Sequence, residues 1–398
     1  LMCKKVQFKI CVVTGTRAEY GLLRNLLLKL RDTENVKLDL VVTGSHLSDR
    51  FGNTQEEIVK DGFDDYIRIA IPLEDDSKEG MAVSTGIAVQ KFAELFKGYK
   101  PDIIIVLGDR FEILAAVIAA HIIGIPVAHI AGGDVTEGAV DDAIRHCITK
   151  MSQLHFPGCE QSAKRIIQMG EEPDRVFNVG EPGVENCLNL KLMSKNELSE
   201  NLNFAINCHD YSVVTFHPVT MENNTAIEQV YQLIHAMDDQ KGMFYIITMA
   251  NADAGGRVIN EIWQKEGKKR ENWLVVPSLG VLRYLSAVKY AKLVIGNSSS
   301  GVIEVPALGT PTINIGDRQK GRMMAESVIQ CDPAQDQITL AIQKGMTPEF
   351  QKMAKNIKSP FGDGTTSSQI VQIVLDYLRH KNETNEKHFF DIDFKNFI

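Results

Sequence analysis

The sequence lacks the features that mark several large classes of protein. No apolar run approaches the roughly 20 residues that a membrane-spanning helix needs. The seven cysteines are scattered and include no C-x-x-C pair, so we expect reduced thiols. The first residues show no signal-peptide pattern, and together these features predict a cytoplasmic protein.

Composition also disfavours two kinds of ligand. The net charge is −8, and no cluster of lysine and arginine supplies the basic face that nucleic-acid binding needs. The ten histidines show no H-E-x-x-H or comparable spacing, so we expect no zinc site. The expected partners therefore include neither nucleic acid nor membrane, and no metal.

Apolar runs alternate with helical patterns along the chain, which predicts an α/β protein with doubly wound parallel sheets and right-handed crossovers. The length of 398 residues suggests two domains. A hinge-like Gly180-Glu181-Pro182-Gly183 divides them. We expect an N-terminal domain over residues 1–180 and a C-terminal domain over 181–364. A helix and tail, 365–398, would pack back on the first domain.

Acidic side chains cluster after two strands of the first half. The strand expected at residues 101–107 contains a continuous apolar run, 103–107, typical of a parallel strand buried on both faces, and Asp109 follows it. The loop and helix after the next strand, residues 126–130, add Asp134, Glu137 and Asp141. Crowded acids raise one another's pKa values, which suits general acid–base catalysis. Asp109 has an alternative role as the N-cap of the following helix.

Three basic or titratable side chains lie at similar places. Arg17, in the first strand-to-helix turn, is either a phosphate contact or a surface arginine. Arg145 is four residues from Asp141, so the two share a helix face. His217 directly follows the strand expected at 212–216. There it either titrates near neutral pH or has a capping or core role.

The segment 292–322 has the pattern of a phosphate-binding loop. An apolar strand, 293–295, leads into Gly296-Asn297-Ser298-Ser299-Ser300-Gly301, and we expect a short helix from near Val302. Free N–H groups at such a helix start favour a phosphate. Glu304 would accept hydrogen bonds from a ribose diol, and Arg318 would contact the negative charge of the phosphate. The alternative is an N-capped helix beside a solvated loop.

These residues together resemble the hydrolysing UDP-N-acetylglucosamine 2-epimerases, the branch with sialic-acid and legionaminic-acid pathway enzymes. The resemblance covers nearly the whole chain. Its motifs are TGTRAEYG (14–21), GDRFE (108–112), GGDVTEGAVDDAIRH (132–146), FHPVT (216–220), NADAG (251–255), GNSSSGVIEVPALGTPTINIGDRQKGR (296–322) and FGDG (361–364). It implies a GT-B fold of two Rossmann-like domains with the active site in the cleft, in a homodimer.

The resemblance also implies roles for single residues. Asp109 and Asp141 match catalytic carboxylates, and His217 another cleft position. The implied substrate-binding and nucleotide-binding residues are Arg17, Arg145, Asn251, Asp253, Val276, Ser298, Ser299, Glu304 and Arg318. Two family positions differ here: Ala131 replaces a catalytic glutamate, and Leu22 stands near the place of a lysine. We expect Glu137 to substitute for that glutamate, with Asp134 as the second candidate.

The implied reaction is hydrolysis with inversion at C2. The diphosphate leaves C1 as the C2 proton is lost, and water then adds to the glycal-like intermediate without a cofactor. The substrate would be UDP-GlcNAc or UDP/GDP-N,N′-diacetylbacillosamine, because relatives lacking the glutamate act on diacetamido sugars. The alternatives are a glycosyltransferase, a sugar-nucleotide sensor without activity and a non-hydrolysing epimerase.

Overall fold

The chain forms two compact units, Leu1–Glu185 with Thr365–Ile398, and Asn186–Gly364. The computed structural model describes residues 7–48, 54–75, 77–136, 140–218, 225–250, 256–380 and 386–393. The first unit extends past residue 180, where we expected it to end. Helix α7 (Pro182–Asn189) begins at that turn, and its Glu185 accepts a hydrogen bond of 2.9 Å from the backbone of Ser367.

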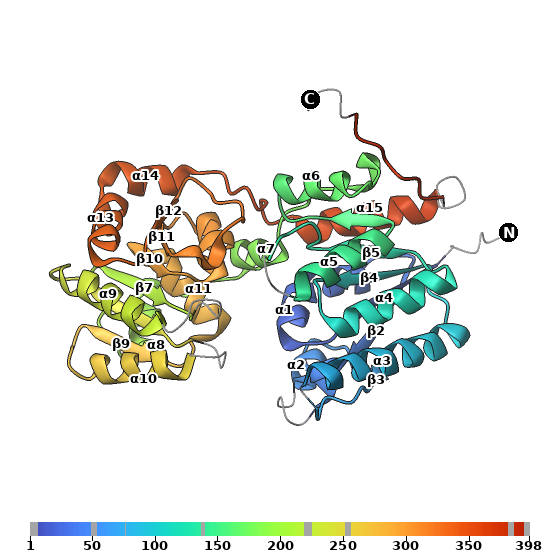
Figure 1. Ribbon diagram of the computed structural model, residues 1–398, viewed down its shortest axis with the longest axis horizontal. Coiled ribbons are helices and arrows are strands. Elements are labelled where there is room, and N and C mark those ends of the chain that lie inside the picture. The colour runs from blue at the N-terminus through green and yellow to red at the C-terminus, as the bar shows by residue number, and fades with distance from the viewer. Residues whose placement is uncertain are drawn as a thin grey trace. The chain divides into compact units, whose positions relative to one another are not determined.

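The first unit is built on a parallel six-stranded sheet with the order β3-β2-β1-β4-β5-β6 (Figure 1). Its strands are β1 (Phe8–Thr14), β2 (Val36–Thr43), β3 (Ile67–Ile69), β4 (Ile103–Leu107), β5 (Val127–Ile130) and β6 (Leu154–Phe156). Its helices are α1 (Arg17–Arg31), α2 (Gln55–Lys60), α3 (Lys78–Gly98), α4 (Phe111–Ile123), α5 (Val140–Met151), α6 (Glu160–Gln168) and α15 (Thr366–Arg379).

Both faces of this sheet are covered by apolar side chains. Helices α1 and α15 pack on one face and α3, α4 and α5 on the other. All five residues of β4 are buried, as expected for a central parallel strand. We also expected a strand over residues 175–179, and this was wrong. Pro173 opens a 3-10 helix there, and only Val176 makes an isolated bridge to His155.

The second unit repeats this architecture, with the strand order β12-β11-β10-β7-β8-β9. Its strands are β7 (Tyr211–Thr215), β8 (Phe244–Thr248), β9 (Trp273–Val276), β10 (Leu293–Gly296), β11 (Thr312–Ile315) and β12 (Val328–Cys331). Its helices are α8 (Lys195–Leu202), α9 (Ala226–Asp238), α10 (Gly256–Gly267), α11 (Gly280–Tyr290), α12 (Ser299–Ile303), α13 (Gln335–Met346) and α14 (Pro348–Asn356).

Each sheet has a point where the strand order reverses. In the first unit β1 lies between β2 and β4, and in the second β7 lies between β8 and β10. Ligands of open α/β sheets bind at such points, outside the carboxyl ends of the strands. The carboxyl ends of β1 and β4, and of β7 and β10, are therefore the places to look for functional side chains.

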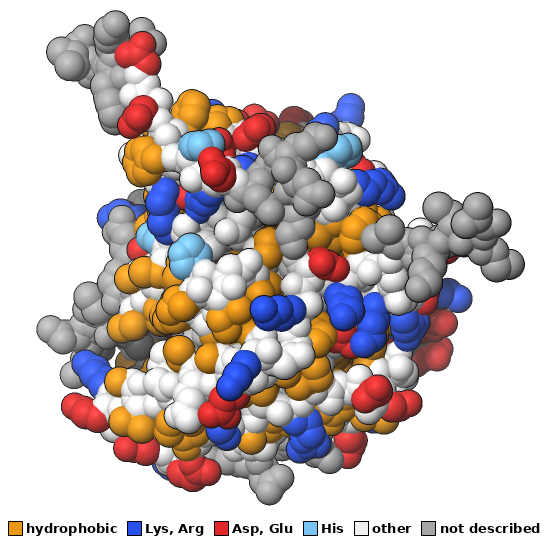
Figure 2. Space-filling model, turned by 90° about the vertical axis from the view of Figure 1, so that its right-hand side faces the viewer, with side chains coloured by type: hydrophobic (Ala, Val, Ile, Leu, Met, Phe, Trp, Pro, Cys, Tyr) orange, Lys and Arg blue, Asp and Glu red, His pale blue; other side chains and the backbone are white. Residues whose placement is uncertain are grey.

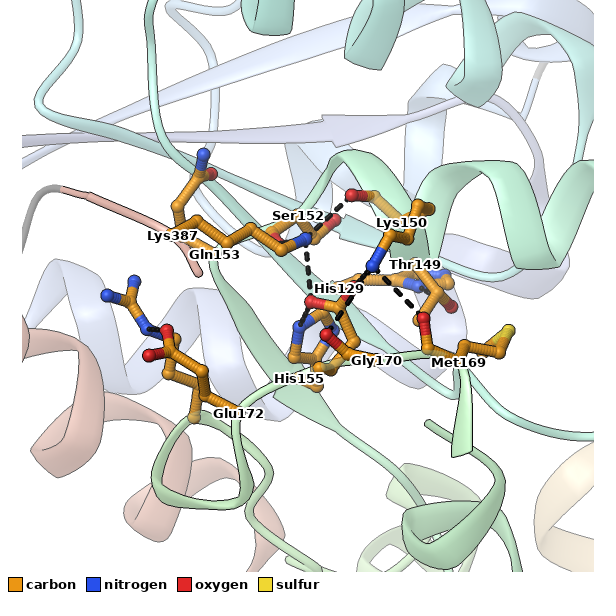
Figure 3. A network of polar contacts seen from close by, with 12 residues as sticks. His129, Thr149, Lys150, Ser152, Gln153, His155, Met169, Gly170, Glu172 and Lys387 are labelled. Carbon is orange, nitrogen blue, oxygen red and sulfur yellow. Dashed lines mark hydrogen bonds and ion pairs between the residues drawn. The ribbon is translucent and has the colours of Figure 1, made fainter. Parts of the chain in front are cut away.

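A buried ion cluster fastens residues 386–393 to the first unit (Figure 3). Lys387 lies 2.6 Å from the Glu171 carboxylate and donates to the carbonyls of Lys150 and Ser152. Glu171 also contacts His155 and Lys150, each at 2.8 Å. Burial alone would raise the pKa of Glu171, but the hydrogen bonds from His155, Lys150 and Lys387 lower it to about 2.

None of the described helices is long and apolar enough to cross a membrane. Figure 2 shows one face of the molecule, on which acidic and basic side chains are interspersed over the described residues.

Candidate active site

Asp109 and Arg145 form the centre of a polar group in the first unit. Asp109 follows β4, and Arg145 lies on α5, which follows β5. The Arg145 guanidinium makes an ion pair with the Asp109 carboxylate and donates to the carbonyl oxygen of Asp134 at 2.8 Å. Only 8% of the Arg145 side chain is exposed, so this cation depends on its partners. Thr136 is a further contact, 3.3 Å from the guanidinium.

Asp141, on the first turn of α5, has a different environment from Asp109. Partial burial and the negative charge of Asp109 raise the pKa of Asp141, and Arg110 and Arg145 limit that rise. The side chain stays exposed to solvent. Asp109 is thus in contact with a cation, whereas Asp141 is biased toward its protonated form. Two carboxyl groups in such different environments suit the roles of base and acid.

His129 connects the strand that leads to Asp109 with the helix that carries Arg145. It is buried in β5, and its Nε2 lies 2.8 Å from the carbonyl oxygen of Gly108. A carbonyl can only accept, so Nε2 carries the proton and Nδ1 accepts from the Thr149 hydroxyl at 3.0 Å. Burial lowers the pKa of His129 to about 3, so the ring is neutral. We did not predict this role, although the position of His129 at a strand end was a usable signal.

Asp134, the second candidate for the family glutamate, contacts a side chain of α6. Its carboxylate accepts a hydrogen bond from the Ser162 hydroxyl, and its catalytic role stays a prediction. Asp142, which we did not single out, accepts from the backbone of Thr136 at 2.6 Å and supports the same loop. Glu137 lies outside the described residues.

Ala131, at the position of the family glutamate, has an unusual backbone conformation. Its φ is +61°, in the left-handed region that a residue with a Cβ rarely adopts. Its backbone N–H donates to the carbonyl of Phe156 at 3.0 Å, which helps to hold it there. Strained residues of this kind concentrate at functional sites.

Arg17 is at the surface in this structure. Its side chain is 68% exposed and lies 2.5 Å from the Glu57 carboxylate. It begins α1, directly after the N-cap Thr16. Its contact with a phosphate stays a prediction.

The second unit contains a pocket of about 390 Å³ outside the carboxyl ends of β7 and β8. Its lining includes His217, Ser298 and Glu304, which we expected, together with Ser300 and Tyr284. Three other expected residues, Val276, Ser299 and Arg318, do not appear in that lining, although Pro277, directly after Val276, does. Asn251 and Asp253 lie outside the described residues.

Asn297 organises the loop beside this pocket, and we did not predict its role. Its side chain accepts from the backbone N–H of His217 at 2.7 Å and donates to the His217 carbonyl at 2.8 Å. Its own carbonyl accepts from Arg318 at 3.2 Å and Gln319 at 2.9 Å. Asn297 therefore ties the end of β7 to the loop after β10 and places Arg318. Gly296 permits this approach, because a Cβ there would lie 1.9 Å from the Thr215 carbonyl oxygen.

The helix after this loop differs from the expectation. It begins at Ser299, not near Val302, and has only five residues. Its free N–H groups and small dipole therefore give weaker support for a bound phosphate than we expected. Burial raises the pKa of Glu304, and the neighbouring Ser300 hydroxyl opposes that rise. A carboxyl group that lines a pocket is suited to accept hydrogen bonds from hydroxyl groups of a ligand.

Within the described ranges, no group of three His, Cys, Asp or Glu side chains is arranged to hold a metal ion.

Comparison with known proteins identifies the family. The sequence profile described as UDP-N-acetylglucosamine 2-epimerase matches residues 28–375. The GDP/UDP-N,N′-diacetylbacillosamine 2-epimerase (hydrolyzing) of Campylobacter jejuni is 39% identical, over 94% of this chain and 98% of that protein. The polysialic acid biosynthesis protein P7 of Escherichia coli is also 39% identical, over 96% and 97%. A UDP-N,N′-diacetylbacillosamine 2-epimerase (hydrolyzing) of Legionella pneumophila is 33% identical, over 95% and 98%.

Solved structures agree on the fold. The UDP-GlcNAc 2-epimerase of Neisseria meningitidis bound to UDP-GlcNAc superposes with a TM-score of 0.75 and 18% identity, over 93% of this chain and 100% of that one. The expected two-domain α/β fold of GT-B type is confirmed. With the profile matching most of its length and relatives above 30% identity, the chain belongs to the UDP-N-acetylglucosamine 2-epimerase family.

Proposed function

We propose that this enzyme is a hydrolysing 2-epimerase that converts a nucleotide-linked 2-acetamido sugar into nucleoside diphosphate and the free manno-configured sugar. The observation that carries the proposal is the unequal environment of two carboxyl groups, since Arg145 contacts Asp109 and Asp141 has a raised pKa. Epimerisation through a glycal needs one acid and one base, and two carboxyl groups in unequal environments suit that division of roles.

In the first step Asp109 takes the C2 proton. The electrons of the C2–H bond form the C1–C2 double bond, and the C1–oxygen bond breaks to release the diphosphate. In the second step Asp141 donates its proton to C2 from the opposite face. Water adds its hydroxyl to C1, and its remaining proton restores Asp141. The proton held by Asp109 passes to solvent, so the reaction consumes one water molecule.

The pocket of the second unit is proposed to bind the nucleotide. Glu304 would accept hydrogen bonds from the ribose hydroxyls, and Ser298 would donate to the diphosphate. Arg318, placed by Asn297, supplies a positive charge for the leaving group. Contacts from Arg17, Asn251, Asp253, Val276 and Ser299 remain part of this proposal.

For the sugar we propose a 2,4-diacetamido-2,4,6-trideoxy hexose. Relatives at 39% and 33% identity are named for N,N′-diacetylbacillosamine, and the resemblance associates loss of the family glutamate, here Ala131, with such substrates. The relative named for polysialic acid biosynthesis, also 39% identical, supports UDP-GlcNAc as the second candidate. The product would then enter legionaminic-acid or sialic-acid synthesis.

The test is incubation with UDP-GlcNAc and with UDP- and GDP-diacetylbacillosamine in D₂O, followed by ³¹P and ¹H NMR. We expect free nucleoside diphosphate and a manno-configured sugar carrying deuterium at C2, formed fastest from a diacetamido substrate. Asp109→Asn should abolish this product while nucleotide binding to the second unit remains. Intact substrate in every incubation of the unmodified enzyme would refute the proposal.

We also propose a cytoplasmic homodimer. The six cysteines among the described residues are all free, in keeping with a reducing compartment. Exposed apolar side chains on two helices of the first unit, Val83 of α3 at 60% and Ile122 of α4 at 76%, support association between copies.

A further inference from the structure

A second pair of carboxyl groups lies in the first unit, apart from Asp109 and Asp141. Glu19 of α1 is 6% exposed and Glu112 of α4 is fully buried. They belong to the helices that follow β1 and β4, the two strands at the switch point. Both converge on Gly15: its N–H donates to Glu19 at 2.7 Å, and a Cβ there would lie 2.7 Å from Glu112.

Arg110 provides the positive charge for this pair. Its Nε donates to Glu112 Oε1 at 2.6 Å and lies 3.9 Å from Glu19 Oε1. The remaining oxygen of Glu112, Oε2, and Oε1 of Glu19 are buried and have no hydrogen-bond partner within the described part of the chain. Two buried carboxylates facing one guanidinium would leave a negative charge uncompensated, which is costly away from water.

A single proton resolves both problems. Protonation of Glu19 removes the excess negative charge. It also turns one of the oxygens without a partner into a hydrogen-bond donor. Burial and the negative charge of Glu112 raise the pKa of Glu19 to about 8, in agreement with this state at neutral pH. Glu112 Oε1 still accepts the hydrogen bond from Arg110 Nε.

Arg110 also acts on Asp141, because its positive charge is one of the two that limit the rise in the pKa of Asp141. We propose that Glu19 and Glu112 share one proton and act as a positioning pair that holds Arg110 in place beside Asp141. This role rests on the proposed epimerase function, in which Asp141 is the acid. It makes Glu19, Glu112 and Arg110 positioning residues, since none of them needs to touch the substrate.

Other titratable or charged groups around this set come from four elements. His46, after β2, is buried and its pKa is lowered to about 4, so it is neutral. Arg17 of α1 is paired with Glu57 of α2. The remaining groups are Asp109 after β4 and Arg145 of α5, which are paired with each other. None of these supplies a second positive charge to Glu19 or Glu112, so the shared proton is the remaining compensation.

The activity test compares the pH dependence of kcat in three isosteric variants. Glu112→Gln combined with Glu19→Gln removes both carboxyl groups that can neutralise Arg110, so the pKa of Asp141 should fall. We expect kcat at neutral pH to drop about threefold and its alkaline limb to move down by roughly half a pH unit. Glu19→Gln alone imitates protonated Glu19, so the alkaline limb of kcat should stay in place. Glu185→Gln, which removes a buried carboxylate bonded to α15, is the matched control and should also keep it.

A spectroscopic test does not depend on turnover. Infrared difference spectra between neutral and alkaline pH should show the carbonyl stretch of a protonated carboxyl group, and Glu19→Gln should abolish it. In Glu112→Gln the same group should titrate at lower pH. Absence of the band in the unmodified enzyme would overturn the shared proton. An unmoved alkaline limb in the variant that combines Glu112→Gln with Glu19→Gln would overturn the positioning role. If the unmodified enzyme releases no product, the epimerase proposal fails, whereas the infrared result still decides on the proton.

Discussion

Replacing Lys387 by methionine tests how the C-terminal segment stabilises the first unit. The substitution keeps most of the aliphatic stem and removes the ammonium group that lies 2.6 Å from Glu171. The side chain is 18% exposed and Glu171 fully buried, so solvent screens this ion pair only weakly.

The magnitude follows from the pKa of Glu171. A fall from the ordinary value of 4.5 to about 2 corresponds to about 3 kcal/mol of stability. His155 and Lys150 remain as partners in the variant, so we expect a loss of about 1 to 2 kcal/mol. For a unit of this size, that lowers the melting temperature by about 4 °C.

The pH dependence has a defined sign. Because the pKa of Glu171 is lower in the folded state, its stabilisation is fully present above about 4.5 and disappears as the pH falls toward 2. The difference between unmodified and Lys387→Met enzyme should therefore be largest near neutral pH and shrink as the solution is acidified below 4.5.

The two tryptophans provide an internal control, because Trp263 and Trp273 both belong to the second unit. Tryptophan fluorescence reports unfolding of that unit, whereas far-UV circular dichroism reports both. Lys387→Met should shift the dichroism transition and leave the fluorescence transition in place. Lys164→Met, at a side chain 73% exposed on α6, is the matched control and should shift neither. An equal shift in both signals, or a difference that grows in acid, would refute the reasoning.

Three further predictions concern the sites themselves. Ala131→Gly should stabilise the first unit by about 1 kcal/mol in urea unfolding, because glycine adopts a φ of +61° without strain; destabilisation would contradict this. Asn297→Ala removes the two side-chain hydrogen bonds to the N–H and carbonyl of His217, so we expect a loss of about 3 kcal/mol in the fluorescence transition and weaker UDP binding by calorimetry. Arg110→Gln removes a charge that lowers the pKa of Asp141, so the alkaline limb of kcat should move upward in pH; a downward shift would exclude Asp141 as the acid.

The architecture was largely predictable, because it depends on local patterns. The continuous apolar strand at residues 103–107 is followed by a helix at 111–123, which is the pattern of a parallel sheet with helical crossovers. This strand was located correctly. The short helices were harder to predict from the sequence. A five-residue helix beginning at Ser299 has too few turns for apolar periodicity, and the 3-10 helix Pro173–Arg175 has only three residues.

The site could be predicted only in part, for a different reason. Asp109, Asp141 and Glu304 were recognisable from strand ends and from the family motifs. The partners that set their chemistry are distant in sequence: Arg145 lies 36 residues from Asp109, and Asn297 lies 80 from His217. No local pattern encodes such a pair. The contact between Asp134 and Ser162 of α6, 28 residues apart in the chain, is a further pair of this kind.

The chain order of the two units has a consequence for synthesis. The second unit is inserted into the first, whose core is completed only by Ile370, Val374 and Leu378 of α15. As the chain leaves the ribosome, the six strands of the first unit and helix α1 emerge early, yet the part of the sheet face that α15 covers stays exposed. The second unit can close before that face does. The first unit, which is made first, is therefore the last to finish folding. A truncation before residue 366 would leave this unit incomplete and prone to aggregation.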